Sequence, residues 1–284
     1  MTKHFGAEII GIDLSSTLNN DVFEKISSVF YKYSVLLFRD QHLSKEKHVE
    51  FTRRFGSLIS ITDAVPLAIS NPNSVDHWFI RFSNVDENGS IRPSDSEQMI
   101  NTFKANALWH SDGSFKKNPD KASVLYAEEV PPEQGETEFA SLRAAYSSLP
   151  DKKKIELEGL VAGHSFFHSR RYFVVDDAAQ SIIDKNPPAE HPIVHVISET
   201  GDKSLFISSH ASHVIGWSID KGESLINELM EFSTQKRFRY LHEWKQGDLI
   251  MWDNRCCLHR GKPWNSDKYK REMRRTTLMG QSQK

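Results

Sequence analysis

Two histidines and one aspartate are the residues of this chain whose types and spacing most readily support chemistry. His110 and Asp112 are separated by one residue where strand character begins, and side chains two apart on a strand point to the same face. His259 ends a second apolar run, from Leu249 onward, that we also expect to be extended. Two histidines and one carboxylate on one face of a metal leave positions open for substrate, as in non-haem iron(II) oxygenases.

A zinc site is the main alternative for these residues. A structural zinc site is usually closed by four ligands, often thiolates. Cys256 and Cys257 lie close before His259, but neighbouring side chains on a strand point to opposite sides. Adjacent cysteines also disfavour a structural disulfide, so we expect two reduced thiols. Because a His-x-Asp tripeptide arises often by chance, its surroundings must decide its meaning.

Composition and charge are typical of a globular protein with a substantial core. Of the 284 residues, 38% are hydrophobic and 26% are charged, and this length favours a single domain spanning residues 1–284. The formal net charge of −2 provides no strong field for nucleic acid or anionic lipid, so we expect neither partner. Without a signal peptide or an apolar run of ~20 residues, a cytoplasmic location is expected.

Hydrophobic periodicity predicts mostly β structure with some helices. Helical spacing covers 20–33, a buried strand follows at 34–39, and Ser44 and Gly56 bound a second helix. Further predicted helices are 141–149, 151–158 and one that begins with an Asp220 and Glu223 capping box; further predicted strands are 122–127, 238–244 and 248–253. The irregular segment 71–99 is predicted to be a substrate loop or lid. An antiparallel double sheet with added helices accounts for this order.

The surroundings of the triad resemble a known enzyme family. The matching segments are 5–14, 35–56, 108–112, 131–137, 252–255 and 271–277. They resemble the taurine dioxygenase superfamily of iron(II)/2-oxoglutarate enzymes, most closely its 2,4-dichlorophenoxyacetate dioxygenase branch. The resemblance implies a double-stranded β-helix, or jelly-roll, with N-terminal and inserted helices. It also implies Fe(II), with 2-oxoglutarate and O₂ as cosubstrates, acting on a small anionic organic substrate.

The resemblance also assigns roles to individual residues. The implied iron ligands and catalytic residues are His110, Asp112 and His259. Thr137 aligns with a hydroxyl that binds 2-oxoglutarate, and Arg275 with the arginine that binds its distal carboxylate. Arg271 would face the same pocket. Arginine suits a partly closed pocket because its planar guanidinium binds a carboxylate bidentately and keeps its charge when desolvated.

The substrate class follows from three segments closer to the aryloxyacetate branch than to the taurine enzyme, namely 142–150, 208–213 and 258–261. We therefore expect an aryloxyalkanoate such as 2,4-dichlorophenoxyacetate, cleaved at its ether bond to a phenol and glyoxylate. The candidate substrate-binding residues are Asn106, His210, His213, Arg81 and Arg92. The two arginines are included because the phenoxyacetate enzymes use upstream lysines, whereas this chain has none between Lys47 and Lys104.

Other functions stay open at this point. Taurine, another alkylsulfonate or a sulfate ester would be cleaved by the same chemistry. A zinc hydrolase could use the same triad, although it would not need Thr137 and Arg275. A non-catalytic jelly-roll binding protein would tolerate loss of the metal ligands, yet all of them are present. The sequence does not determine the oligomeric state, so a homo-oligomer also stays open.

Overall fold

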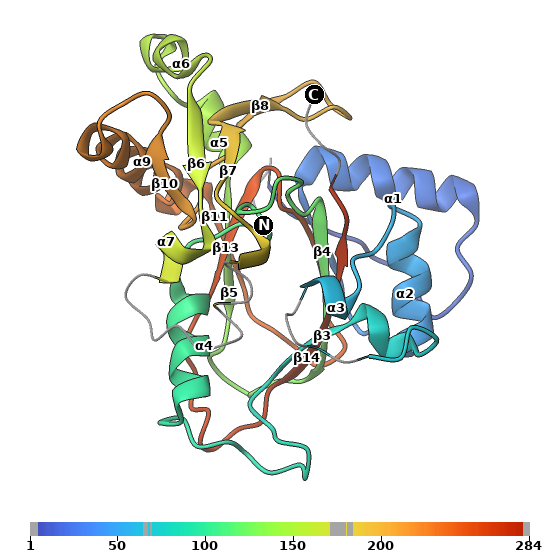
Figure 1. The fold of residues 1–284 in the computed structure, drawn as a ribbon. Helices are drawn as coiled ribbons and strands as arrows, with labels where there is room; N and C mark the ends of the chain where they lie inside the picture. Colours follow the sequence, from blue (N-terminus) through green and yellow to red (C-terminus); the bar gives the residue numbers. More distant parts are fainter. Residues whose placement is uncertain (1–4, 65–67, 69, 171–179, 181–183, 281–284) are drawn as a thin grey trace.

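Two facing β-sheets form the centre of the molecule. The computed structural model describes residues 5–64, 68, 70–170, 180 and 184–280. The larger sheet has the order β1-β2-β12-β4-β14-β3, and the smaller has the order β11-β5-β13 (Figure 1). The strands of the larger sheet are β1 (Ala7–Glu8), β2 (Val35–Phe38), β3 (Ile80–Ser83), β4 (Ala122–Glu129), β12 (Leu249–Asp253) and β14 (Glu272–Leu278). Those of the smaller sheet are β5 (Thr137–Ser141), β11 (Arg239–His242) and β13 (Cys257–Gly261).

Smaller sheets and helices surround this centre. The remaining strands are β6 (Val161–His164), β7 (Ala189–Pro192) and β10 (Ala211–Val214) in one sheet, and β8 (Val194–Val196) and β9 (Lys203–Leu205) in another. The described α-helices are α1 (Asn20–Tyr33), α2 (Lys45–Arg53), α3 (Ile61–Ala64), α4 (Glu97–Ala107), α5 (Leu142–Ser147), α6 (Asp151–Leu157), α7 (Phe166–Arg170) and α9 (Ile219–Ser233). Two 3₁₀ helices are η1 (Val75–Trp78) and η2 (Lys236–Phe238).

The sequence of strand β2 is apolar throughout because both faces of this strand are covered. Leu36 and Phe38 face outward and pack in a cluster with side chains of α1 and α2, which cover this side of the sheet in Figure 1. Val35 and Leu37 face inward and share a second cluster with Phe139 of the smaller sheet. Successive side chains of a strand point to opposite faces, and here both faces are covered. The core therefore lies on both sides of the larger sheet.

Several local predictions are confirmed. The first helix has the predicted bounds, and the Asn19 side chain caps it by accepting the Val22 N–H at 2.9 Å. Ser44 caps α2 as expected, although this helix ends at Arg53, before Gly56. Cys256 and Cys257 are both buried, and neither forms a disulfide among the described residues.

Two local predictions are wrong. The α9 helix begins at Ile219 after Ser218, which makes no side-chain cap, so Asp220 lies inside the first turn and the predicted capping box is not formed. The segment 71–99 is not wholly irregular, because it contains η1, β3 and the start of α4. Strand β3 forms there because it pairs with the edge of β14, a long-range contact that local sequence does not reveal.

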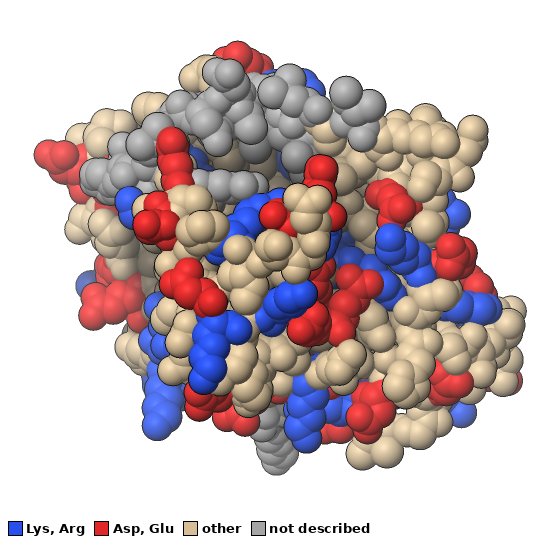
Figure 2. Space-filling view, turned by 90° about the horizontal axis from the view of Figure 1, so that it is seen from below, with Lys and Arg blue, Asp and Glu red and all other residues tan. Residues whose placement is uncertain are grey.

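As expected from the sequence, the architecture combines β-sheets with helices that lie before and between the strands. Figure 2 shows one face of the molecule, on which Lys and Arg side chains are interspersed with Asp and Glu. This mixture matches the near-zero net charge. Among the described residues, no helix combines the length and apolar character needed to cross a bilayer.

Candidate active site

Backbone pairing brings the two candidate histidine ligands together. The His110 N–H donates to the His259 carbonyl at 3.0 Å, and the His259 N–H donates back at 2.8 Å. Their ring centroids are 4.1 Å apart. His259 lies on β13, as expected, but His110 forms only an isolated bridge and Asp112 lies in a turn. The predicted strand through Asp112 is therefore wrong, because the chain enters a turn at Asp112 and Gly113 adopts a left-handed φ of +63°.

The three side chains fit a divalent metal. One ligand atom from each of His110, Asp112 and His259 lies within 4.8 Å of the others. The His110 Nδ1–H donates to the Leu108 carbonyl at 2.8 Å, which leaves Nε2 as the donor atom for a metal. Burial lowers the pKa of His110 and, together with the nearby His110 ring, that of His259. Both imidazoles are thus neutral with a free lone pair, as metal binding requires.

Asp112 is held as a charged carboxylate. Its two oxygens each lie 2.8 Å from Nη1 of Arg275, and Oδ2 also accepts the Ser123 hydroxyl at 2.7 Å. Burial raises the Asp112 pKa, but the Arg275 guanidinium, helped by His259 and His110, outweighs burial and holds this pKa well below its usual range. The donor set is therefore two neutral imidazoles and one carboxylate.

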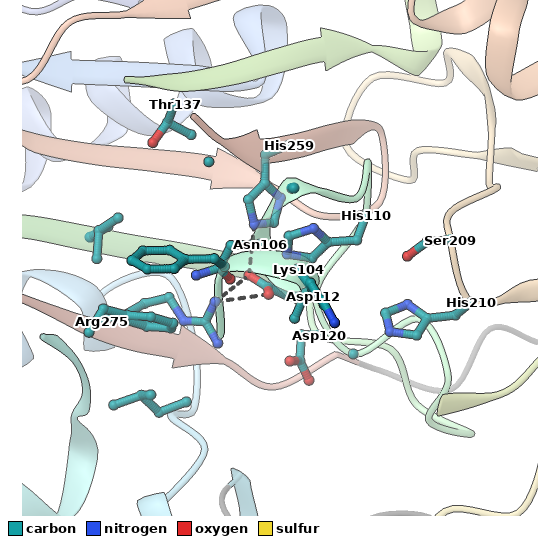
Figure 3. A pocket seen from close by; sticks show the side chains of 18 of the residues that line it. Lys104, Asn106, His110, Asp112, Asp120, Thr137, Ser209, His210, His259 and Arg275 are labelled. Atoms are coloured by element: carbon teal, nitrogen blue, oxygen red, sulfur yellow. Dashed lines mark hydrogen bonds and ion pairs between the residues drawn. The ribbon is translucent and has the colours of Figure 1, made fainter. Parts of the chain in front are cut away.

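A cavity of about 530 Å³ opens next to these three residues. In Figure 3, Thr137 and Arg275 lie on one side of the two ligating histidines, and Ser209 and His210 lie on the other. We call the side with Arg275 the arginine lobe. We call the side with His210 the aromatic lobe, because Phe115 and Phe166, whose rings contact His210, also line the cavity. The cavity thus extends to both sides of the two histidines.

The arginine lobe contains a half-buried cation and the hydroxyl group of a buried threonine. Thr137 begins β5, and its hydroxyl accepts the indole N–H of Trp244 at 2.9 Å. The Arg271 guanidinium packs over Trp264, 5.2 Å from the ring centroid, and its Nε has no hydrogen-bond partner among the described residues. Burial lowers the pKa of Arg271 to about 10. A desolvated cation without an anionic neighbour is suited to binding an anion.

The structure brings only some of the candidate substrate residues into the cavity. Asn106 and His210 line it. Arg81 does not, because its guanidinium pairs bidentately with Glu272 on an exposed strand edge, with nitrogen to oxygen distances of 2.7 to 2.9 Å. His213 packs its ring against Gly163, and Arg92 is likewise outside the described lining. The expectation that these three residues line the pocket is therefore corrected.

Sequence reasoning missed three residues that line the aromatic lobe. Phe115 lies three positions after Asp112, so its proximity to the triad was a usable signal. Phe166 and Arg170 lie on the five-residue helix α7, which is far from the triad in sequence. Their place in the cavity depends on tertiary packing, and no local pattern indicates it.

A buried site with two histidines, one carboxylate and a nearby desolvated cation is typical of a metal-dependent oxygenase. The chain matches the family model "Taurine catabolism dioxygenase TauD, TfdA family" over residues 1–277, and it belongs to this family. It is 40% identical over 281 residues to the alpha-ketoglutarate-dependent 2,4-dichlorophenoxyacetate dioxygenase of Cupriavidus pinatubonensis, covering 97% of this chain and 94% of that protein. The predicted reaction class, an Fe(II)- and 2-oxoglutarate-dependent dioxygenase, is confirmed.

Two further comparisons agree with this family. The chain is 33% identical over 268 residues to the (S)-phenoxypropionate/alpha-ketoglutarate-dioxygenase of Sphingobium herbicidovorans, covering 92% of this chain and 87% of the relative. Its structure is similar to the crystal structure of AAD-2 in complex with Mn(II) and N-oxalylglycine, with a TM-score of 0.86 and 34% identity. That alignment covers 99% of this chain and 96% of AAD-2. A zinc hydrolase and a non-catalytic binding protein are thereby disfavoured.

Proposed function

We propose that this protein oxidises an aryloxyalkanoate such as 2,4-dichlorophenoxyacetate. The observation that carries the proposal is the 40% identity, along nearly the whole of both chains, to a 2,4-dichlorophenoxyacetate dioxygenase. The aromatic lobe supports it, because Phe115, Phe166 and His210 offer ring faces to an aryl group beside the triad. The substrate would be a small organic anion.

In this proposal, His110, Asp112 and His259 hold Fe(II). The bound iron supplies O₂ activation, and the protein supplies orientation and a water-poor cavity. The Leu108 carbonyl fixes the His110 tautomer, while Arg275 and Ser123 fix the Asp112 carboxylate. These partners prepare the three donor atoms before the metal binds.

We infer that 2-oxoglutarate occupies the arginine lobe. The family resemblance assigned its distal carboxylate to Arg275, with Arg271 facing the same pocket. The contacts favour the opposite order, because Arg275 is engaged with the metal ligand Asp112, whereas Arg271 is half-buried without a described anionic partner. Arg271 and the Thr137 hydroxyl would then bind the distal carboxylate. Arg275 would lie near the end of the cosubstrate that approaches the metal.

The proposed reaction converts one O₂ and one 2-oxoglutarate for each substrate oxidised. One oxygen atom enters succinate as CO₂ leaves, and the other becomes a hydroxyl group on the carbon next to the ether oxygen. The resulting hemiacetal collapses to a phenol and glyoxylate. The protein directs this outcome by holding that carbon toward the open face of the triad.

The proposal extends to the fold and the domain organisation. We infer that the two facing sheets form the double-stranded β-helix, or jelly-roll, expected from the resemblance. The shared core between β2 and Phe139 of the smaller sheet supports this inference. The family match over residues 1–277 supports one domain for residues 1–284.

Steady-state kinetics test the proposed substrate. We expect kcat/KM for 2,4-dichlorophenoxyacetate to exceed kcat/KM for taurine and for an alkyl sulfate, measured by succinate release with Fe(II) and 2-oxoglutarate. A substrate-free reaction gives the background of uncoupled turnover. A clear advantage for taurine or the sulfate ester would overturn the substrate while leaving the reaction class intact.

A further inference from the structure

We propose that Asn254 is a positioning residue for the metal site, which it holds in shape without contributing a ligand. The inference rests on the part of the proposed function that makes His110, Asp112 and His259 the metal ligands. Asn254 follows directly after strand β12 and is completely buried. Its side chain makes three hydrogen bonds, and each of them ends at a metal ligand or at a residue that contacts one.

The alternation of side chains along β12 brings a neutral amide toward Asp112. Trp252 and Asn254 are two positions apart, and side chains at this spacing point to the same side of a strand. The Trp252 indole N–H accordingly reaches the Asn254 side chain at 2.9 Å. Asp253 lies between them, and its carboxylate pairs with Arg255 at 2.7 and 2.9 Å. The charged side chain at position 253 therefore has a partner of its own.

The Asn254 amide holds Asp112 at two points. Its oxygen accepts the Asp112 backbone N–H at 3.3 Å. Its nitrogen donates to the Ser123 oxygen at 3.1 Å, so the Ser123 hydroxyl keeps its hydrogen for Oδ2 of Asp112 at 2.7 Å. The Asn254 backbone carbonyl also accepts the hydroxyl of Ser111, which lies between His110 and Asp112 in the chain. One residue thus fixes both the backbone and the carboxylate of the aspartate ligand.

The same amide reaches the His259 side of the site through Trp252. The amide oxygen accepts the Trp252 indole N–H, and the Trp252 ring centroid lies 4.8 Å from that of His259. In turn, Nε2 of His259 lies 3.8 Å from Oδ2 of Asp112 (Figure 3). The positions of the carboxylate ligand and of one histidine ligand are therefore linked through Asn254.

The contacts explain why an asparagine suits this position. An amide accepts through its oxygen and donates through its nitrogen without carrying a charge. An aspartate at this position would not donate to Ser123, and it would place a second negative charge beside Asp112. An apolar residue would leave the buried N–H groups of Asp112 and Trp252 without this acceptor.

Metal binding in the absence of 2-oxoglutarate and substrate tests this role. The full chain is titrated with Mn(II), and the free metal is measured by electron paramagnetic resonance. We expect Asn254→Ala to raise the Kd for Mn(II) about tenfold to a hundredfold, the range typical for losing a partner of a metal ligand. Far-UV circular dichroism at the temperature of the titration checks that the variant is folded. An unchanged Kd in the folded variant would overturn the proposal.

Asn84→Ala is the matched control. Asn84 is also a buried asparagine whose side chain makes three hydrogen bonds, donating to the Ser266 and Tyr269 carbonyls and accepting the Arg271 N–H. None of these bonds reaches a metal ligand. Asn84→Ala should therefore lose stability in urea, as Asn254→Ala does, but should bind Mn(II) with the Kd of the wild type. An equal rise in Kd in both variants would overturn the proposal, by indicating a general effect of lost stability.

Trp252→Phe provides a second test that does not depend on the folding of Asn254→Ala. Phenylalanine keeps a ring beside His259 but removes the N–H that holds the Asn254 amide. The Kd for Mn(II) should rise about threefold, the effect of losing one hydrogen bond. The same substitution should cause no further rise in the Asn254→Ala background. An unchanged Kd in Trp252→Phe, or multiplicative effects of the two changes, would overturn the positioning role. Unaltered Mn(II) binding in Asp112→Ala would instead overturn the metal site itself.

Discussion

The Arg275 guanidinium lies 2.8 Å from both carboxylate oxygens of Asp112. One residue therefore connects the arginine lobe to the candidate metal site. A cation at this position keeps Asp112 ionised despite its burial, and ionised carboxylate is the form that binds a metal. The same cation lies where the metal-proximal end of 2-oxoglutarate would approach. In contrast, no described hydrogen bond joins Arg271 to His110, Asp112 or His259.

This difference predicts distinct effects for the two arginines. Arg271→Gln should raise the KM for 2-oxoglutarate well over tenfold, because removing one partner of a desolvated charge pair costs about 2 to 5 kcal/mol. It should leave the Kd for Mn(II) unchanged in the absence of 2-oxoglutarate. Arg275→Gln should weaken Mn(II) binding as well, because the Asp112 carboxylate loses the guanidinium that orients both of its oxygens. Equal effects of both variants on metal affinity would contradict the assigned roles.

The metal ligands give a second prediction. Asp112→Ala and His259→Ala should each lose most bound iron and at least a thousandfold in turnover, while far-UV circular dichroism stays close to that of the wild type. Removing one of three ligands leaves too few donors for a stable site. His213→Ala is the control, because this histidine lies outside the described cavity lining. Normal iron content together with coupled turnover in either ligand variant would show that the metal is held elsewhere.

How far the sequence predicts this site depends on whether a residue is placed by local or by long-range contacts. The helix Asn20–Tyr33 was predictable because its apolar spacing and Asn19 cap are local signals. The triad was predictable through residue types and family resemblance. Strand β3 and the place of Arg170 were not, because pairing with β14 and packing of α7 on Phe115 and His210 are decided by distant parts of the chain.

The strand assignment at Asp112 shows a related limit. Two-residue spacing correctly predicted convergence with His110, but the chain achieves it through one bridge and a turn at Gly113. A residue in the left-handed region can reverse the backbone within a few positions, so a short spacing fits a turn as well as a strand. Spacing thus predicted which side chains meet, but not the backbone that positions them.

Trp244 gives a third prediction, about the Thr137 hydroxyl. The indole N–H can only donate, so the hydroxyl accepts it at 2.9 Å and keeps its own hydrogen for another acceptor. Thr137→Val should raise the KM for 2-oxoglutarate about tenfold, because it removes a hydrogen bond to a charged group. Trp244→Phe should raise the same KM about threefold. Because Trp244 acts through Thr137, Trp244→Phe should cause no further rise in this KM in the Thr137→Val background. The kcat should be similar in the two single variants and the double variant. Independent, multiplicative effects would contradict this dependence.

His164 gives a fourth prediction, on stability against pH. Burial lowers its pKa to about 3, against an ordinary value of 6.5, and neither ring nitrogen has a hydrogen-bond partner among the described residues. As the pH falls below 6.5, the unfolded chain takes up this proton and the folded protein does not, so stability is lost toward acid. This one group should contribute a loss of about 2 kcal/mol between pH 7.5 and pH 5.

The variant His164→Phe tests this contribution by urea unfolding at both pH values. Phenylalanine keeps a ring next to Phe206, onto which His164 stacks at 5.4 Å, and it cannot take up a proton. The free energy of unfolding of the variant should therefore fall by about 2 kcal/mol less than that of the wild type between the two pH values. The same pH dependence in both proteins would show that His164 is not the group responsible.

We expect the oxidation of 2-oxoglutarate to be coupled to ether cleavage of an aryloxyacetate. The most direct test is to quantify succinate and 2,4-dichlorophenol in the same reaction, with the wild type, Fe(II), O₂, 2-oxoglutarate and 2,4-dichlorophenoxyacetate. We expect equal amounts of the two products, and neither product above background when Fe(II) is omitted. Phenol formed without succinate, or succinate no higher than in the substrate-free reaction, would contradict it.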